Sequence, residues 1–264
     1  MKKISLALCL AGLFTFASAD IFSVSAGYGI QEQKIGGYIQ NGDNKNYFGE
    51  KSVNPTDPYT GYLGLKNKKH PYFWVKLIHP IPVIPNMKFQ YTKYETSGHS
   101  NYISGNVSLF GKTRITYIIT DADTYMSINS YDASLFYEFK PAIADIEIGA
   151  GVDYWKLKFS VYDNVNKRYA VNYSGSIPLP YVYGNIETMK FFNFSLIGNA
   201  KIAKLGDNHH YDYLGALKYT IDIPGPINPF IKVGYKYKEL FYKDGTDETK
   251  LSFKGAFAEL GVKF

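Results

Sequence analysis

The stretch "YFWVKLIHPIPVIPNMKFQYTKY", residues 72–94, decides the fold class. Its two flanks, 72–78 and 87–94, alternate between two kinds of side chain with a period of two, which indicates β-strands. Between them "HPIPVIPN", residues 79–86, places three prolines in eight residues. Proline fixes φ and donates no ladder hydrogen bond, so such a segment ends strand pairing sharply. The stretch therefore predicts two antiparallel strands joined by a stiff turn.

The same alternation recurs along the chain, with apolar or aromatic side chains on one parity and small, polar or charged ones on the other. The clearest runs are residues 22–30, 131–139, 146–154, 211–223 and 231–237. Several exceed the usual strand of about five or six residues and reach the length that a tilted strand needs to cross a bilayer. The chain contains 25 Tyr and 18 Phe but only 2 Trp. Aromatic girdles at the two membrane interfaces would explain this excess.

The N-terminus reads as a secretory signal peptide. Lys2 and Lys3 precede an apolar run over residues 4–16, which is too short for a membrane-spanning helix, and Ala17-Ser18-Ala19 supplies a cleavage site before Asp20. We expect residues 1–19 to be removed, leaving a single domain over 20–264. Cys9 lies in the removed part, and Leu8 before it is not the small residue of a lipoprotein signal. The exported chain therefore has no disulfide. Its net charge falls from +6 to +4, which is too mild to indicate a nucleic-acid partner.

The connections between strands are of two kinds that take turns along the chain. The short ones, often with proline, are residues 79–86, 140–145, 187–190 and 224–229. The polar and often longer ones are residues 32–70, 95–128, 162–175, 205–210 and 243–249. Short periplasmic turns and longer extracellular loops are typical of outer-membrane barrels. We therefore expect an all-β, transmembrane, antiparallel up-and-down barrel in the outer membrane, with its long extracellular loops near 32–70 and 95–128.

The predicted strands number about ten: 21–31, 71–78, 86–95, 129–139, 145–160, 176–187, 190–204, 210–223, 229–242 and 250–264. Residues 59–66 are a further strand or a short element within the first long loop, so eight and twelve strands stay open. Within 145–161 the apolar parity changes at Tyr154–Trp155, which suggests a β-bulge.

The last residues, "FAELGVKF", end on Phe264, with Ala258, Leu260 and Val262 at the same parity. This resembles the closing strand of bacterial outer-membrane barrels, whose terminal aromatic residue is the signal that the barrel assembly machinery reads. The segment 74–98 is similar to the hallmark of a family of small proteobacterial outer-membrane β-barrel proteins with an "HPxPxxPN" turn. The likeness extends through residues 131–139, 146–154 and 209–219 to the terminus. That family has no assigned activity, so the resemblance implies fold and location and transfers no functional residues.

If the apolar parity faces lipid, the opposite parity faces the lumen. The lumen-facing candidates are Lys76, Lys88, Asp132, Glu138, Glu147, Asp153, Lys201, Asp212, Lys218, Asp222, Lys232, Lys236 and Glu259. In a barrel of about ten strands, mixed charge most simply means ion pairs that fill the lumen. We expect a structural or surface-interaction protein. The alternative is a narrow passive pore for small solutes, because the inward Gly27, Gly29, Gly149, Gly151 and Gly234 thin the wall.

A rim-located hydrolase is a third hypothesis. It would use "GDNHHYDY", residues 206–213, which gathers Asp207, His209, His210 and Asp212, a set that could bind a metal or activate water. No serine or second carboxylate pair at a recognisable spacing completes a catalytic set, so we expect no enzyme, no metal and no cofactor. Lipid and lipopolysaccharide are the expected partners in the membrane, and the sequence specifies no extracellular ligand.

Overall fold

The computed structural model describes residues 22–49 and 59–264, so the expected signal peptide over 1–19 lies outside the described residues. The described residues form fourteen strands. These are β1 Ser23–Asn41, β2 Asn44–Gly49, β3 Thr60–Leu65, β4 Lys68–Ile78, β5 Asn86–Ser100, β6 Val107–Leu109, β7 Thr113–Ile115, β8 Ala122–Phe139, β9 Ala144–Asp163, β10 Arg168–Thr188, β11 Phe194–Leu205, β12 Asn208–Thr220, β13 Asn228–Asp244 and β14 Asp247–Lys263. Within these ranges no helix has the length and apolar character to span a membrane.

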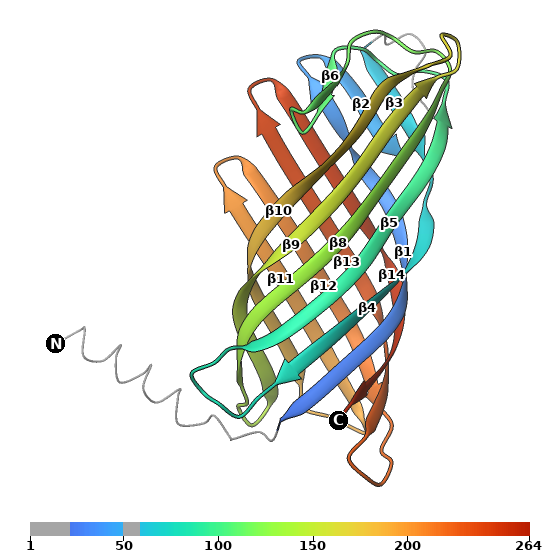
Figure 1. Cartoon of the computed structure of the whole chain (residues 1–264). Helices are drawn as coiled ribbons and strands as arrows, with labels where there is room; N and C mark the ends of the chain where they lie inside the picture. Colours follow the sequence, from blue (N-terminus) through green and yellow to red (C-terminus); the bar gives the residue numbers. More distant parts are fainter. Residues whose placement is uncertain (1–21, 50–58) are drawn as a thin grey trace, which may run out of the picture.

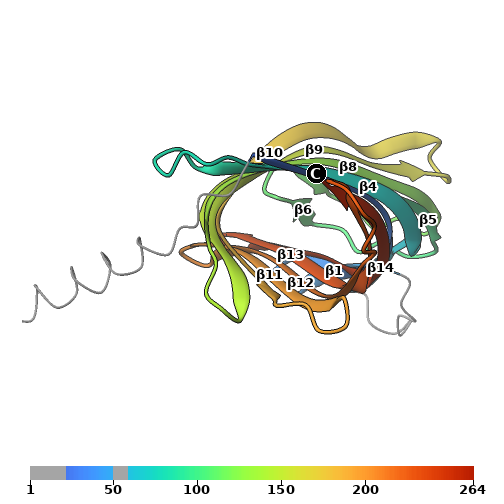
Figure 2. The same cartoon turned by 90° about the horizontal axis from the view of Figure 1, so that it is seen from below.

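Ten of the strands pair in a closed antiparallel ring, which confirms the predicted fold class (Figures 1 and 2). The order around the ring is β1, β4, β5, β8, β9, β10, β11, β12, β13 and β14, with β14 pairing back to β1. Closure leaves no free sheet edge along the shared length of the strands, and this is what allows a β-sheet to cross a bilayer. Both described chain ends lie at the lower end in Figure 1, beside the short turns.

The strands that make up the wall change at the opposite end of the barrel, beyond the first residues of β4. There β2 pairs with β1 and, in parallel, with β3, and β3 reaches β5 through Leu65 and Gly98. Residues 59–66 are therefore a further strand that widens the wall only at this end. The segments expected as loops hold much regular structure, because β1 runs on to Asn41, where it pairs with Asp247 at the start of β14, and β5 runs on to Ser100.

The outward parity forms an apolar band around the barrel. Its exposed members include Ile30, Phe73, Phe89, Leu135, Ile148, Val182, Leu217, Val233 and Leu260. At the upper edge of the band, Tyr91, Tyr131 and Tyr154 pair directly across three neighbouring strands. At the lower edge, the rings of Phe194 and Tyr219 lie 4.8 Å apart. An apolar belt edged by aromatic residues on both sides is the outer surface of a transmembrane barrel.

The parity change at Tyr154–Trp155 is not a bulge. The register of β9 with β8 and with β10 passes these residues without a shift. What changes is the surroundings of the strand. Above Tyr154 the outward residues are Lys156 and Lys158, which are exposed, whereas Trp155 and the residues that follow at its parity are buried inside the barrel. The strand leaves the membrane at this height, and the barrel interior becomes apolar at the same height.

The proline-rich turn is held by its two polar ends. The backbone N–H of His79 donates to Oδ1 of Asn86 at 3.0 Å, and the His79 ring contacts the turn through Pro85 O at 3.2 Å and the N–H of Ile81 at 3.2 Å. Tyr137 of β8 also donates to the carbonyl of Val83. Side-chain bonds thus replace the donors that the prolines lack, and the turn is fixed to the neighbouring strand as well as to itself.

Candidate functional site

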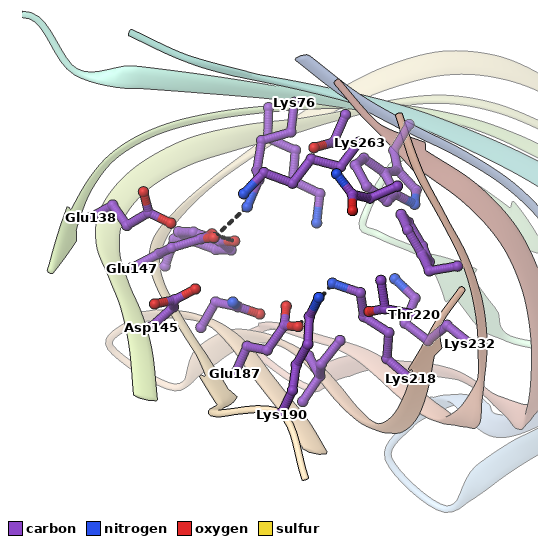
Figure 3. Close-up of a pocket in the computed structure, with 18 residues that line it drawn as sticks. Lys76, Glu138, Asp145, Glu147, Glu187, Lys190, Lys218, Thr220, Lys232 and Lys263 are labelled. Carbon is purple, nitrogen blue, oxygen red and sulfur yellow. Dashed lines mark hydrogen bonds and ion pairs between the residues drawn. The ribbon is translucent and has the colours of Figure 1, made fainter. Parts of the chain in front are cut away.

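The lumen is occupied by three successive layers, and the lowest is a charged basin open at the turn end. The basin has a volume of about 250 Å³ and is lined by four carboxylates and six lysines. The carboxylates are Glu138, Asp145, Glu147 and Glu187, and the lysines are Lys76, Lys88, Lys190, Lys218, Lys232 and Lys263. Figure 3 shows the carboxylates gathered on the side of β8, β9 and β10, with Lys218 and Lys232 across the basin from them.

Ion pairs hold three of the basin's lysines. Lys76 Nζ lies 2.7 Å from Glu147 and Lys218 Nζ 2.8 Å from Glu187, both of which line the basin, and Lys232 Nζ lies 2.6 Å from Glu259, its cross-strand neighbour on β14. Asp222, which the sequence assigned to the lumen, instead lies beyond the end of β12 and is exposed. The strand ends at Thr220, so the inward parity ends there as well.

The middle layer is a network of buried charges across the barrel. Asp153 accepts three hydrogen bonds, from Lys238 at 2.7 Å, Ser130 at 2.6 Å and Trp155 Nε1 at 2.7 Å. Lys238 also lies 3.3 Å from Asp212. Because both Asp153 and Lys238 are almost fully excluded from solvent, each depends on the other for compensation of its charge.

A second buried pair lies beside the first. Lys201 Nζ bonds Asp132 at 2.7 Å, and the hydroxyl of Tyr181 donates to the other carboxylate oxygen of Asp132 at 2.8 Å. The hydroxyl of Tyr72 donates in the same way to Glu259 at 2.7 Å. Lys236 completes the layer, with its Nζ 3.9 Å from the centre of the Tyr72 ring. All twelve of the other predicted lumen-facing residues lie on the inner side of the wall.

Three of the five inward glycines named from the sequence, Gly27, Gly29 and Gly151, are covered by aromatic rings. Gly27 is directly paired with Trp74, and a Cβ on Gly27 would lie 2.6 Å from the Trp74 indole nitrogen. Gly29 has the same relation to Tyr72, and Gly151 to Tyr181, both with a Cβ closer than 3 Å to the ring. These glycines therefore make room for rings across the strand pair, an arrangement known to stabilise glycine in sheets, and the lumen gains no open space from them.

The third layer is an apolar plug at the upper end, made by residues 101–121 between β5 and β8. This segment turns into the barrel, where Figure 2 shows β6 inside the ring of strands. Six of its apolar side chains are at most 4 % exposed, namely Ile103, Val107, Leu109, Phe110, Ile115 and Ile119. They form one cluster with the inner wall, which contributes Met126, Ile128, Trp155, Leu157, Phe159, Val161, Leu240, Leu251 and Phe253.

Polar bonds fix the plug to the wall on two sides. Asn46 of β2 exchanges two bonds of 2.8 Å with the backbone of Ser104, and the N–H of Phe110 donates to Thr249 of β14 at 3.0 Å.

Above the membrane, His99 of β5 bonds Asp123 of β8 at 3.0 Å. This hydrogen bond raises the pKa of His99 and lowers the pKa of Asp123, which also accepts a bond from Asn164.

The four residues proposed as a rim site do not come together. Asp207 lies in the exposed turn between β11 and β12, and His209 points outward, stacked on Tyr211 and Phe241. His210 points inward and is buried, and Asp212 belongs to the charge network of Lys238. Alternation along β12 therefore separates the two histidines onto opposite faces of the wall. Within residues 22–49 and 59–264, no three His, Cys, Asp or Glu side chains are placed to hold a metal ion.

The interior contains important residues that the sequence did not indicate, among them Lys238, Ser130 and the ring-bearing Tyr72 and Trp74. A signal for Lys238 was present, because it continues the parity of Lys232 and Lys236. Tyr72 and Trp74 also stand at the parity of Lys76, but the alternation pattern gives no sign that their rings lie over inward glycines.

A gap in the wall is the remaining feature of the site. Strands β10 and β11 pair only over Val182–Glu187 and Ile197–Ile202, whereas β10 continues upward to Arg168. The hairpin β11–β12 ends below its neighbours in Figure 1. A largely apolar cavity of about 790 Å³ lies there, reaching from β10 to the upper end of β13.

No protein-family model and no curated protein matches this chain. Among solved structures, the chain is similar to Ail, the attachment invasion locus protein of Yersinia pestis, solved with the heparin analogue sucrose octasulfate (12 % identity, 92 % of this chain and 97 % of that one, TM-score 0.35). It is similar to the outer membrane protease OmpT of Escherichia coli (8 %, 94 % and 97 %, 0.43). It is also similar to a mutant of the monoaromatic hydrocarbon channel TodX (4 %, 94 % and 92 %, 0.29). Among these three, no identity exceeds 12 % and no TM-score exceeds 0.43, so the likeness does not transfer the activities named to this chain.

Proposed function

We propose that this chain is a non-enzymatic outer-membrane barrel with a closed lumen, which acts as a structural or surface-interaction protein and does not carry solutes. The observation that supports this most is the plug of residues 101–121. Its apolar side chains are buried against the inner wall of the barrel. An ion that reached this layer would have to lose its hydration without finding a polar partner, at a cost of several kcal/mol or more.

The middle layer supports the same proposal. A conducting pore needs charges that face water, but Asp153, Lys238, Asp132 and Lys201 are each at most 4 % exposed and bond one another. The basin beneath them is therefore a pocket that opens toward the periplasm and is closed at its upper end by these buried charges. The interacting surface would then be the outer one.

The surface just above the apolar band is rich in lysine. Lys93, Lys156, Lys158, Lys204 and Lys254 lie on the outward parity of four strands, β5, β9, β11 and β14. Phosphate groups of lipopolysaccharide would lie at this height, and lysine binds phosphate as a point charge. The C-terminal Phe264 is placed for a different partner. Its N–H donates to Val24 O at 2.8 Å at the closing seam, where the assembly machinery would read the last strand.

Solute flux tests the proposal. Ser100 and Ala122 are directly opposed in the register of β5 and β8, so residues 101–121 can be replaced by an Asn-Gly turn that closes the hairpin. In liposome-swelling assays with small sugars, we expect no flux through the unaltered protein and measurable flux through the variant without the plug. The matched control replaces residues 164–167, the turn between β9 and β10, by the same Asn-Gly pair.

Heat-modifiable gel migration confirms that each protein is folded and inserted before the assay. Flux through the unaltered protein would contradict the closed-lumen proposal and favour a narrow passive pore. Equal flux through the variant without the plug and the turn control would show that the plug is not the barrier.

A further inference from the structure

The gap between β10 and the β11–β12 hairpin forms a lateral window in the barrel wall. Its lining includes Leu179, Val182, Ile202, Leu205, Leu240 and Phe241. In the described part of the chain, residues 168–181 of β10 pair with β9 and with no strand on the other side. A volume of about 790 Å³ is in the range of pockets that hold small organic ligands.

Two prolines protect the unpaired edge of β10. Pro178 and Pro180 share one parity, and the ladder with β9 passes both without a shift of register. Because proline has no N–H to donate, residues at this parity direct their N–H away from β9 and toward the window. The prolines thus remove two backbone donors from the window edge, which keeps that edge apolar and prevents another strand from pairing with it.

The window lies at the upper edge of the membrane band. Val182 is 63 % exposed on the outer face within the band, and Pro178 pairs with Tyr154 at the aromatic edge. Beyond this height the outward residues of β10 become polar, beginning with Ser176. An apolar molecule in the outer leaflet could therefore enter the window sideways without crossing water.

A buried polar group lies at the inner end of the window. His210 lines the cavity and is 2 % exposed, and neither of its ring nitrogens has a hydrogen-bond partner. The nearest carboxylate oxygen, Asp153 Oδ2, is 4.0 Å from Nε2, beyond hydrogen-bonding distance, and the Trp155 ring contacts the imidazole edge-on. An unsatisfied buried imidazole is costly unless a ligand supplies the partner.

We infer that the lateral window binds a free fatty acid, with the aliphatic chain against the apolar lining and the carboxyl oxygen hydrogen-bonded to His210. A carboxyl is small enough to reach a nitrogen inside the wall, whereas the headgroup of a diacyl phospholipid would have to stay outside. The inference concerns the wall and goes beyond the proposed function, because it holds whether or not the lumen conducts.

Photolabelling of the intact barrel tests the site. The protein is refolded into phosphatidylcholine liposomes that contain either a palmitic acid analogue with a mid-chain diazirine or a phospholipid that carries the same chain. After irradiation, labelled peptides are mapped by mass spectrometry. We expect the fatty acid to label residues 173–182 and 240–242 above the rest of the outer wall. The phospholipid should label all the outward strands evenly.

Matched variants locate the ligand within the window. Ala203→Trp fills the window, and Ala133→Trp places the same side chain on the lipid face of β8. Only the first should abolish the preferential labelling. His210→Leu should weaken it about five-fold, the contribution of one ordinary hydrogen bond, and His210→Gln should restore much of it.

Heat-modifiable migration shows which variants are folded. If Ala203→Trp does not fold, competition by unlabelled palmitic acid against hexadecane replaces it, and only the acid should displace the probe. Even labelling around the barrel, or equal labelling of the window by the phospholipid, would overturn the inference. Unchanged labelling in folded His210→Leu would overturn the role assigned to His210.

Discussion

At the residue scale, the arrangement of side chains inside the barrel depends on which buried charges have a partner. Asp153 combines contacts from three strands, because Lys238 belongs to β13, Ser130 to β8 and Trp155 to its own strand β9. Buried ion pairs contribute little net stability relative to a well-packed apolar pair, but the loss of one partner leaves a charge without compensation. The network therefore fixes how β8, β9 and β13 lie around the lumen more than it adds to the free energy of folding.

Asp153→Asn should lower the free energy of unfolding by about 3–5 kcal/mol, because it removes the principal counter-charge of a buried lysine. Asp153→Leu combined with Lys238→Met should recover most of this loss. Urea titration in liposomes, followed by the heat-modifiable gel band, measures both. The control is Asp207→Asn in the exposed turn, which should have no measurable effect. A double variant as unstable as Asp153→Asn would show that the charges themselves are required.

Alternation alone predicted which residues face inward, because parity in a strand is a local property. It could not predict the partners. Lys201 lies opposite Asp212 in the β11–β12 register but bonds Asp132 across the lumen. Which inward residues meet across the barrel depends on strand tilt and stagger, and these are properties of the closed ring. The same limit hid the unpaired nitrogens of His210, since a histidine beside Asp212 in sequence gives no sign that its ring lacks a partner.

At the element scale, the same barrel strand meets two environments along its length. Strand β9 faces lipid with Val152 and Tyr154 and faces water above them with Lys156, while its inner side changes from Asp153 to Leu157. The sequence signal of this change was visible but was interpreted as a bulge. At one height the outer face changes from apolar to charged and the inner face changes from charged to apolar. This happens when a strand leaves the membrane and gains an apolar neighbour inside the barrel. That neighbour, the plug, comes from a segment expected as an extracellular loop.

Ile119→Asp tests the plug as an element. It should lower the free energy of unfolding by roughly 3 to 5 kcal/mol, because an unpartnered carboxylate would be buried in the apolar layer. Ile118→Asp is the control, since the adjacent Ile118 is 51 % exposed whereas Ile119 is 1 % exposed. Urea titration compares the two. Equal losses would mean that the segment does not pack inside the barrel as described.

At the scale of the whole molecule, the architecture was predictable and the use of its interior was not. Strand length, one-sided alternation and the two kinds of connection predict a transmembrane barrel of about ten strands, because each reflects the thickness and chemistry of a membrane. The filling of the lumen depends on side chains of non-neighbouring strands that meet only after closure, such as Lys238 and Asp153. The lateral window likewise results from the unequal lengths of β10 and the β11–β12 hairpin, which no single segment reveals.

The central claim is that the basin, the charge network and the apolar plug together close the lumen. The most direct test is single-channel conductance of the refolded protein in a planar bilayer, beside the variant in which Asn-Gly replaces residues 101–121. The account predicts silence from the inserted, unaltered protein and discrete openings from the variant. Steady discrete openings of the unaltered protein, with an ion preference that responds to Lys201→Met or Asp132→Asn, would contradict it.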